Sequence, residues 1–190
     1  MGKRSEGFER RQRGFYPTPL AAFKPLVPRL SHVATYIDPC AGDGALCHHL
    51  ANGEFYVGAA FDIEPQHPHV KRFDACELTA EQLAELPNIM FVTNPPWPEP
   101  HQNGEPTLSI LEHLRGIAPT WLLLPSDFMH NVYAAEPMRF CAEIVSVGRV
   151  KWIPGSKDDG KDNCAWYLFM PFANGGVLGF TGRQPKRKAA

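Results

Sequence analysis

The segment Asn94-Pro95-Pro96-Trp97 has the residue types that point most specifically to chemistry. It follows residues 89–93, an apolar stretch typical of a buried strand. An Asn side-chain oxygen and a nearby backbone carbonyl can accept hydrogen bonds from an amine and direct its nitrogen at an electrophilic methyl group. Two prolines restrict the loop, and the indole offers a flat face to a planar base. The alternative interpretation is a proline-rich turn with a stray Trp.

A glycine-containing turn, Asp38-Pro39-Cys40-Ala41-Gly42-Asp43-Gly44, lies between an apolar stretch and a helical pattern. Gly42 and Gly44 allow a sharp turn and the close approach of a ligand, which the first amides of the following helix can face. The turn lacks the GxGxxG of a dinucleotide site, and its acids would repel a pyrophosphate. Asp38 is better placed to reach an ammonium or sulfonium group. An ordinary strand–helix turn is the alternative.

Two further acids follow the glycine turn. Asp62 ends a second apolar stretch 20 residues after Gly42, a spacing at which a carboxylate can hydrogen-bond the ribose of a nucleoside-containing cofactor. Asp74 could accept a hydrogen bond from an adenine amino group. Asp62 could instead cap a turn at the end of its strand, so its functional interpretation depends on the glycines upstream.

The elements that must position these residues alternate between strands and helices. The patterns predict strands at 33–38, 55–62, 89–93 and 120–125, and helices at 19–30, 45–52, 79–86, 107–117 and 134–141. Residues 143–153 and 164–172 flank a polar loop and predict an antiparallel hairpin. We therefore expect an α/β fold with a mostly parallel central sheet, helices on both faces and an antiparallel C-terminal hairpin.

The composition fits one globular domain. The chain has 190 residues, of which 44% are hydrophobic, and this length suffices for a single core. Its five cysteines show no CxxC spacing, so we expect reduced thiols and no metal site. No apolar run approaches the roughly 20 residues of a membrane helix, and the polar start predicts no signal peptide. These features predict a cytoplasmic protein.

Charge is concentrated at the two ends of the chain. The first 15 residues have a net charge of +3 and residues 183–190 have +4, so the remainder of a chain with net charge −1 has −8. We expect basic arms at 1–14 and 181–190 around a catalytic domain at 15–180. Such arms can contact nucleic-acid phosphates, although solvated termini are the alternative.

Three segments occur in an order that resembles a known family. They are Phe15-Tyr16-Pro17-Thr18-Pro19, the glycine turn at 38–44 and Asn94-Pro95-Pro96-Trp97. Together they resemble amino-methylating DNA methyltransferases of the Rossmann-like class I, most of all small phage or prophage adenine-N6 enzymes, over residues 14–172. The family often has Tyr or Phe in place of Trp97. No separate target-recognition domain follows Phe172, which implies relaxed or short sequence specificity.

The resemblance implies S-adenosyl-L-methionine as the cofactor, with a role for each segment. The implied cofactor contacts are Tyr16, Pro17 and Thr18 at the methionine part, Asp38, Pro39, Cys40, Ala41, Gly42 and Gly44 in the loop, Asp62 and Ile63 at the ribose, and Asp74 and Ala75 along the adenine. Asn94, Pro95, Pro96 and Trp97 would hold the target adenine. The strand containing Trp166 would lie near the base flipped out of the duplex.

Lys157, in the polar loop of the expected hairpin, is a further candidate for a contact with DNA phosphate. The alternative is a solvated loop without a partner. The loop 99–106, after the Asn-Pro-Pro segment, could close over a substrate.

We therefore expect methyl transfer to the N6 amine of adenine in single- or double-stranded DNA by a monomer or weak dimer. A sulfonium activates the methyl group, so neither a nucleophilic residue nor a metal is required. The same geometry would serve another planar amine, namely RNA adenine, cytosine N4 or a protein glutamine. A non-catalytic module that binds the cofactor or nucleic acid is the alternative from a different class.

Overall fold

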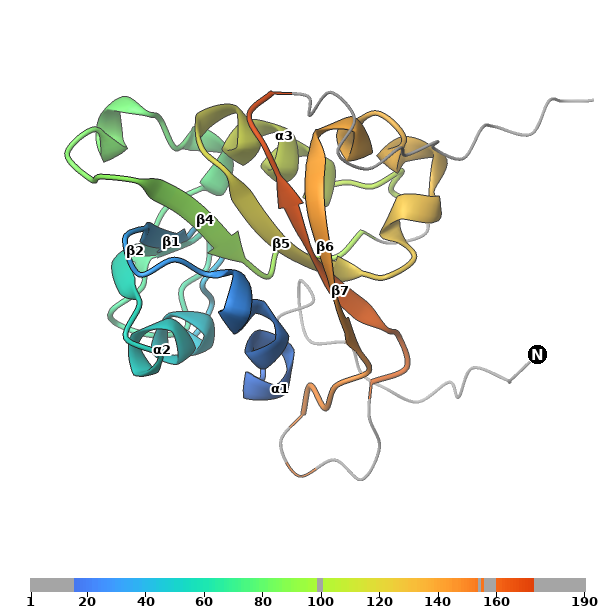
Figure 1. Ribbon diagram of the computed structural model, residues 1–190, viewed down its shortest axis with the longest axis horizontal. Coiled ribbons are helices and arrows are strands. Elements are labelled where there is room, and N and C mark those ends of the chain that lie inside the picture. The colour runs from blue at the N-terminus through green and yellow to red at the C-terminus, as the bar shows by residue number, and fades with distance from the viewer. Residues whose placement is uncertain (1–15, 99–100, 154, 156–159, 173–190) are drawn as a thin grey trace, which may run out of the picture.

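The computed structural model describes residues 16–98, 101–153, 155 and 160–172, which form a seven-stranded sheet with helices on both faces (Figure 1). The predicted arms at 1–14 and 181–190, and Lys157, lie outside these residues. Within the described ranges, no helix is both long and apolar enough to cross a bilayer.

The strand order is β3-β2-β1-β4-β5-β7-β6. The strands are β1 (Thr35–Asp38), β2 (Tyr56–Asp62), β3 (Lys71–Arg72), β4 (Ile89–Thr93), β5 (Thr120–Pro125), β6 (Cys141–Gly148) and β7 (Cys164–Phe169). The pairs from β3 to β5 are parallel, whereas β7 is antiparallel to both β5 and β6. The predicted mostly parallel sheet with an antiparallel C-terminal hairpin is confirmed. The order reverses between β1 and β4, and open α/β sheets bind ligands at such a point.

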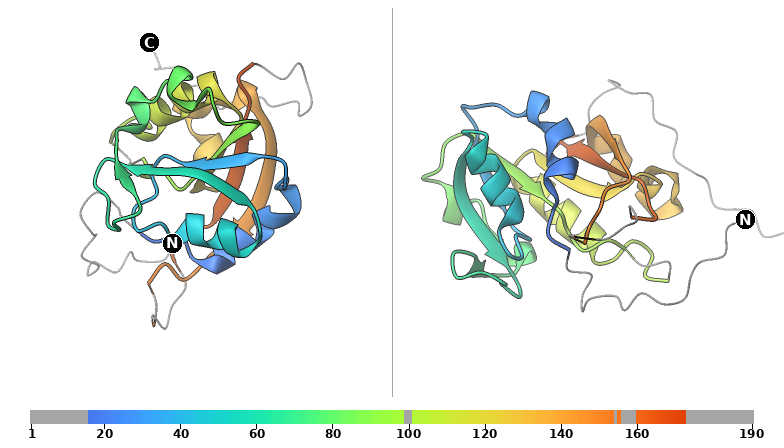
Figure 2. Two further views of the ribbon diagram at one scale, coloured as in Figure 1. Left: turned by 90° about the vertical axis from the view of Figure 1, so that its left-hand side faces the viewer. Right: turned by 90° about the horizontal axis from the view of Figure 1, so that it is seen from below.

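Alternate residues of the central strands pack on opposite faces, as the two-residue period of a strand requires. In β5, Trp121 and Leu123 pack on the face covered by α1 (Leu20–Phe23), η2 (Lys24–Arg29) and α2 (Ala45–Asn52). Leu122 packs with Leu111 of α3 (Thr107–Ile117) on the other face. Figure 2 shows these helices on the two sides of the twisted sheet, so the prediction of helices on both faces is confirmed.

The two longest helices have the bounds predicted from the sequence. Helix α2 buries Leu46 and Leu50, and α3 buries Ile110, Leu111 and Leu114. These spacings of three and four residues place each set on one helix face, which is the face that packs on the sheet. The periodic pattern was therefore sufficient to predict both helices.

Two predicted helices are broken into shorter pieces by proline. Residues 19–30 form the four-residue α1 followed by the 3-10 helix η2, which contains Pro25 and Pro28. Residues 134–141 contain the end of one 3-10 turn and a second that starts at Pro137. Proline lacks an N–H and cannot continue the α-helical hydrogen bonds. The 3-10 turns are η3 (Ala75–Glu77), η4 (Glu81–Leu83), η5 (Phe128–His130), η6 (Val132–Ala134) and η7 (Pro137–Phe140).

The helix predicted at 79–86 is only the single turn η4. Its start is capped as expected, because Thr79 and Gln82 each accept a hydrogen bond from the other's backbone amide, at 3.3 and 2.8 Å. However, the turn buries only Leu83, and Pro87 follows closely. A cap without an extended apolar face does not sustain a helix.

The C-terminal hairpin is shorter than predicted. Strand β6 ends at Gly148 and β7 ends at Phe169, so residues 149–153 and 170–172 lie beyond the paired strands. The two-residue strand β3 was not predicted, because two exposed basic residues give no strand pattern. Residues 149–153, which leave β6, form part of a connection that projects beyond the sheet (Figure 1).

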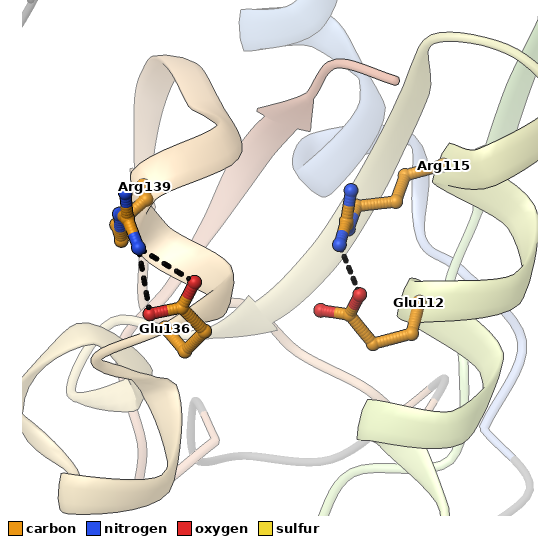
Figure 3. Close-up of polar contacts among 4 residues, drawn as sticks. All are labelled: Glu112, Arg115, Glu136 and Arg139. Carbon is orange, nitrogen blue, oxygen red and sulfur yellow. Dashed lines mark hydrogen bonds and ion pairs between the residues drawn. The ribbon is translucent and has the colours of Figure 1, made fainter. Parts of the chain in front are cut away.

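An arginine joins α3 to the segment before β6. The Arg115 guanidinium lies 3.5 Å above the Phe140 ring centre and also pairs with Glu112 on its own helix (Figure 3). A second ion pair, Arg139 Nη1 to Glu136 Oε1 at 2.9 Å, lies within η7 and its cap. The cation–π contact therefore helps to hold η7 against α3.

We predict that Trp166→Phe lowers the free energy of unfolding by about 1–3 kcal/mol in urea denaturation. Trp166 is fully buried, and its indole N–H donates to the Ala22 carbonyl of α1 at 2.8 Å. The substitution removes that donor and leaves a gap between β7 and α1. The half-buried Trp152→Phe is the control and should cost less than about 1 kcal/mol. Equal costs for the two variants would contradict the prediction.

Candidate functional site

The predicted site residues lie at or just after the carboxyl ends of neighbouring parallel strands. Strands β1, β2 and β4 are parallel neighbours, and they end at Asp38, Asp62 and Thr93. The glycine turn follows β1 and Asn94 follows β4 directly. The topology therefore brings together the three segments that the sequence predicted to work together.

The glycine turn adopts a conformation that needs its two glycines. Gly42 and Gly44 have φ angles of 54° and 81°, in the left-handed region where a Cβ is unfavourable. The Ala41 amide donates to the Phe61 carbonyl at 2.8 Å, which fixes the turn against β2. Gly44 is the N-cap of α2, and the Ala45 amide at the start of this helix donates to Asp43 Oδ1 in the turn at 3.0 Å.

Asp62 braces the turn from the neighbouring strand. Its Oδ2 accepts a hydrogen bond from the Gly42 amide at 2.8 Å, and its Oδ1 accepts one from the Glu64 amide at 2.7 Å. The residue is half-buried, and each carboxylate oxygen can accept a second hydrogen bond. Asp62 can therefore order the turn and still accept hydroxyl groups from a ligand.

Asp38 lies beneath the turn and is 1% exposed. Its Oδ1 accepts hydrogen bonds from the Thr93 hydroxyl at 2.6 Å and from the Cys40 amide at 3.2 Å. Burial raises the pKa of Asp38 to about 7; the two hydrogen bonds oppose this shift, and the negative charges of Asp62 and Asp43 add to it. Asp38 therefore joins the end of β1 to the end of β4, a contact that the sequence did not predict.

The remaining predicted cofactor residues flank the turn. Asp74 Oδ1 accepts a hydrogen bond from the Cys76 amide at 2.8 Å and so caps η3. Ala75 is buried in the core. Ile63 has an exposed side chain directly after Asp62.

A groove of about 430 Å³ lies beside the turn. It is lined by Pro65, Gln66, His67, Pro68, Val70 and Arg72. The Gln66 amide donates to the Gly42 carbonyl at 2.9 Å. Arg72 of β3 lies opposite Asp62 of β2 in the register of these two parallel strands. The groove is therefore next to the carboxylate that was predicted to bind ribose.

The Asn-Pro-Pro loop is fixed at both ends. Asn94 Nδ2 donates to the Tyr16 carbonyl at 3.4 Å, which links β4 to the N-terminal segment. The Pro96 carbonyl accepts a hydrogen bond from the buried Thr107 hydroxyl, at the start of α3, at 2.6 Å. Because its amide nitrogen faces Tyr16, the Asn94 side chain directs its oxygen away from this partner.

An aromatic group surrounds the loop. The Trp97 indole N–H donates to the Leu123 carbonyl of β5 at 2.9 Å. Its ring meets the Trp152 ring edge-to-face with centroids 5.3 Å apart, and Trp152 lies 6.4 Å from the Tyr16 ring. These three rings come from separate parts of the chain and bring planar surfaces close to Asn94.

Trp152 was missed by the sequence analysis. It was assigned to a predicted strand at 143–153, but it lies past the end of β6 at the edge where β4 and β5 end. A Cβ on Gly160 would lie 2.7 Å from the Trp152 ring, so this glycine permits the close packing. The turn residues after Gly148 were the available signal that the strand had ended.

Trp166 does not lie in the candidate site. Its side chain has no exposed surface, and it packs in the core between β7 and the helices α1 and α2. The alternation of β7 explains this position, because Trp166 and Cys164 face that core. An indole without accessible surface cannot contact a base, so the predicted substrate role of Trp166 is not supported.

The segment Tyr16-Pro17-Thr18 contacts both Asn94 and helix α2. Thr18 is 6% exposed, and its carbonyl lies 3.0 Å from His49 Nε2 of α2. His49 in turn stacks on Phe23 of α1 at a centroid distance of 5.7 Å. The helix that follows the glycine turn therefore also holds the N-terminal segment.

Cysteine chemistry at the site is suppressed by burial. All five cysteines are free, and burial raises the pKa of the Cys40 and Cys47 thiols well above the ordinary value, with the negative charge of Asp38 adding to the effect. These thiols are therefore protonated at neutral pH. Within the part of the chain that the structure describes, no group of three or more His, Cys, Asp and Glu side chains could hold a metal ion.

Neither a family model nor a curated protein sequence matches the chain. The solved structures that are similar in fold include the following three. The type IIG restriction endonuclease BpuSI has a TM-score of 0.54 at 17% identity, with 84% of this chain and 24% of that chain covered. A chain of a type I R-M system has a TM-score of 0.56 at 16% identity, with 85% of this chain and 43% of that chain covered. A modification subunit assigned to a type I restriction enzyme of Vibrio vulnificus YJ016 has a TM-score of 0.56 at 12% identity, with 83% of this chain and 45% of that chain covered.

The fold that the chain shares with these structures is a mixed α/β fold, here with a seven-stranded and mostly parallel sheet. At 12–17% identity, these likenesses concern the arrangement of strands and helices. The chain spans between a quarter and just under half of the length of the three similar chains.

We predict that Asp38→Asn stabilises the protein increasingly as pH rises. The folded-state pKa of about 7 lies above the unfolded value of about 3.9, so the native wild type binds more protons between these values and loses stability as pH increases. Asn does not titrate. The difference in unfolding free energy between variant and wild type should grow by about 2–3 kcal/mol from pH 5 to pH 8.

Urea denaturation across this pH range measures the difference directly. Thr120→Val removes a buried hydroxyl of β5 without changing a titratable group, so as the control it should give a constant difference from wild type. A constant difference for Asp38→Asn as well would show that the buried carboxyl does not titrate in this range.

Proposed function

We propose that the chain transfers a methyl group from S-adenosyl-L-methionine to the N6 amine of adenine in DNA. The observation that supports this most directly is the position of Asn94 beside the glycine turn. Thr93, which precedes Asn94, is hydrogen-bonded to Asp38, the first residue of the turn segment. A donor on the turn and an amine at Asn94 would therefore share one edge of the sheet.

The residues around the turn fit the chemistry of this cofactor. The left-handed glycines let the backbone approach a ligand closely. Asp62 retains acceptor capacity for ribose hydroxyls, and Ile63 offers an exposed apolar surface next to it. The adjoining groove gives space for the nucleoside, with Asp74 and Ala75 on the following segment. Tyr16 to Thr18 and the turn 38–44 would contact the methionine part.

When bound, the cofactor supplies a methyl group that its positively charged sulfur already activates. The chain's own task is then to hold the amine. Asn94 Nδ2 faces the Tyr16 carbonyl, so Oδ1 can accept a hydrogen bond from the amine together with a backbone carbonyl of the diproline. These acceptors stabilise the nitrogen more strongly as it becomes positive, which lowers the barrier.

The aromatic group offers a place for the extruded base. An adenine amine inside a duplex is inaccessible, so the base must leave the stack at a cost of a few kcal/mol. Stacking on an aromatic side chain returns about 1–3 kcal/mol per base. Trp97 is the candidate from the Asn-Pro-Pro motif, and the rings of Trp152 and Tyr16 belong to the same aromatic group.

Mass spectrometry of nucleosides tests the proposal. The full chain is incubated with S-adenosyl-L-methionine and with duplex DNA, single-stranded DNA or RNA of the same sequence, and each polymer is digested. We expect N6-methyldeoxyadenosine in the DNA samples. Methylated RNA alone, or N4-methylcytosine, would redirect the proposal to another amine. No methylated nucleoside in any sample would contradict it.

We predict that Asn94→Ala reduces methyl transfer at least about 100-fold and leaves the cofactor affinity within about threefold. The variant loses the amine acceptor but none of the residues assigned to the cofactor. Transfer is measured by nucleoside mass spectrometry and affinity by calorimetry. Asn52→Ala, at the exposed end of α2, is the control and should behave as wild type. Wild-type transfer by Asn94→Ala would remove Asn94 from the active site.

We predict that Asp62→Ala weakens cofactor binding at least about tenfold in calorimetry. The variant loses the acceptors for ribose and also releases the Gly42 amide that shapes the turn. Glu81→Ala removes an exposed acid from η4 and should leave the affinity unchanged. If both variants bind as wild type does, Asp62 does not contact the cofactor.

A further inference from the structure

The ladder between β1 and β4 stops before it reaches the site. The paired residues run from Thr35 opposite Ile89 to Ile37 opposite Phe91. Beyond this last pair, the Thr93 hydroxyl donates to Asp38 Oδ1 at 2.6 Å. Both side chains are buried, at 0% and 1% exposure. A side-chain hydrogen bond therefore joins the two strands where their backbones are no longer paired.

We propose that Thr93 is a positioning residue for methyl transfer, because its hydrogen bond to Asp38 holds the Asn94 loop in register with the glycine turn. This inference rests on the proposed function. Thr93 does not touch either reactant; it acts through Asn94, its neighbour in sequence. Effective transfer needs the reacting atoms to be aligned closely, and a displacement of about 1 Å can cost roughly 100-fold in rate.

The strength of this hydrogen bond depends on the charge of Asp38. The groups around it are Asp62 at the end of β2, Asp43 in the turn, and the thiols of Cys40 and Cys47. Burial and the two neighbouring acids raise the pKa of Asp38, while the Thr93 hydroxyl lowers it. A hydrogen bond to an ionised acceptor is stronger than one to a neutral acceptor. Protonation of Asp38 at lower pH therefore weakens the link to Thr93.

Thr93→Val tests the proposal because it keeps the shape of the side chain and removes the donor. We expect kcat to fall about 10- to 100-fold. The Kd for S-adenosyl-L-methionine, measured by calorimetry, should stay within about threefold, since no cofactor contact is lost. The acidic limb of the kcat–pH profile should move to higher pH, because Asp38 loses a bond that favours its ionised form. Thr93→Ser restores the donor and should recover most of the rate and the original limb.

Asp38 can also be followed without any reaction. In the cofactor-free protein, carbon-13 NMR of the side-chain carboxyl should give a higher pKa for Asp38 in Thr93→Val than in Thr93→Ser. Thr120→Val is the matched control: Thr120 is a fully buried threonine of β5 whose hydroxyl donates to the Ala118 carbonyl at 2.9 Å. This control should lose stability but keep kcat and the pH profile.

The outcomes separate this inference from the function on which it rests. A wild-type chain that methylates no polynucleotide overturns both. If the wild type is active and Thr93→Val matches Thr120→Val in rate and pH profile, the positioning role is wrong while the proposed function stands. An unchanged pKa of Asp38 in the NMR titration of Thr93→Val would overturn the link between the two side chains. Should Thr93→Val fail to fold, Thr93→Ala, which also removes the hydroxyl, decides in its place. A lower kcat and a shifted acidic limb relative to Thr93→Ser support the role, and values equal to those of Thr93→Ser overturn it.

Discussion

Two parallel strands that lie side by side end at the same edge, and this constraint determines where the chemistry-bearing residues meet. Strand β1 leads into the glycine turn and β4 leads into the Asn-Pro-Pro loop, although 55 residues separate Asp38 from Thr93. Both loops lie at this end of the sheet because the apolar residues of their strands are fixed in the core. The position of the site is therefore a consequence of sheet topology, and its finer geometry depends on hydrogen bonds between the loops.

The sequence predicted those parts of the molecule that depend on local patterns. Strands β4 and β5 and helices α2 and α3 have the expected bounds, because each combines a regular apolar period with a clear boundary residue. The glycine turn was recognised because only glycine tolerates its φ angles. The predicted helix at 79–86 failed because a good cap and helix-forming residues do not replace a buried face.

The residues that sequence reasoning misplaced depend on tertiary packing. Trp166 and Trp152 are aromatic residues of the C-terminal part of the chain, and nothing in the local pattern favours one over the other as a site residue. Trp166 faces the core because of its register in β7, whereas Trp152 lies past the end of β6 where the chain turns. The contact between Thr93 and Asp38 could not be predicted either, because a Thr at the end of an apolar stretch is typical of an ordinary strand.

The indole of Trp166 reaches the Ala22 carbonyl across 144 residues of sequence, and the Tyr16 ring lies near Trp152 in the same way. Contacts of such wide separation must offset the entropy of closing a long loop, so they stabilise only a chain that is ordered over most of its length. The aromatic part of the site therefore depends on the C-terminal hairpin being in place against β5. A complete glycine turn alone provides no stacking surface for a base.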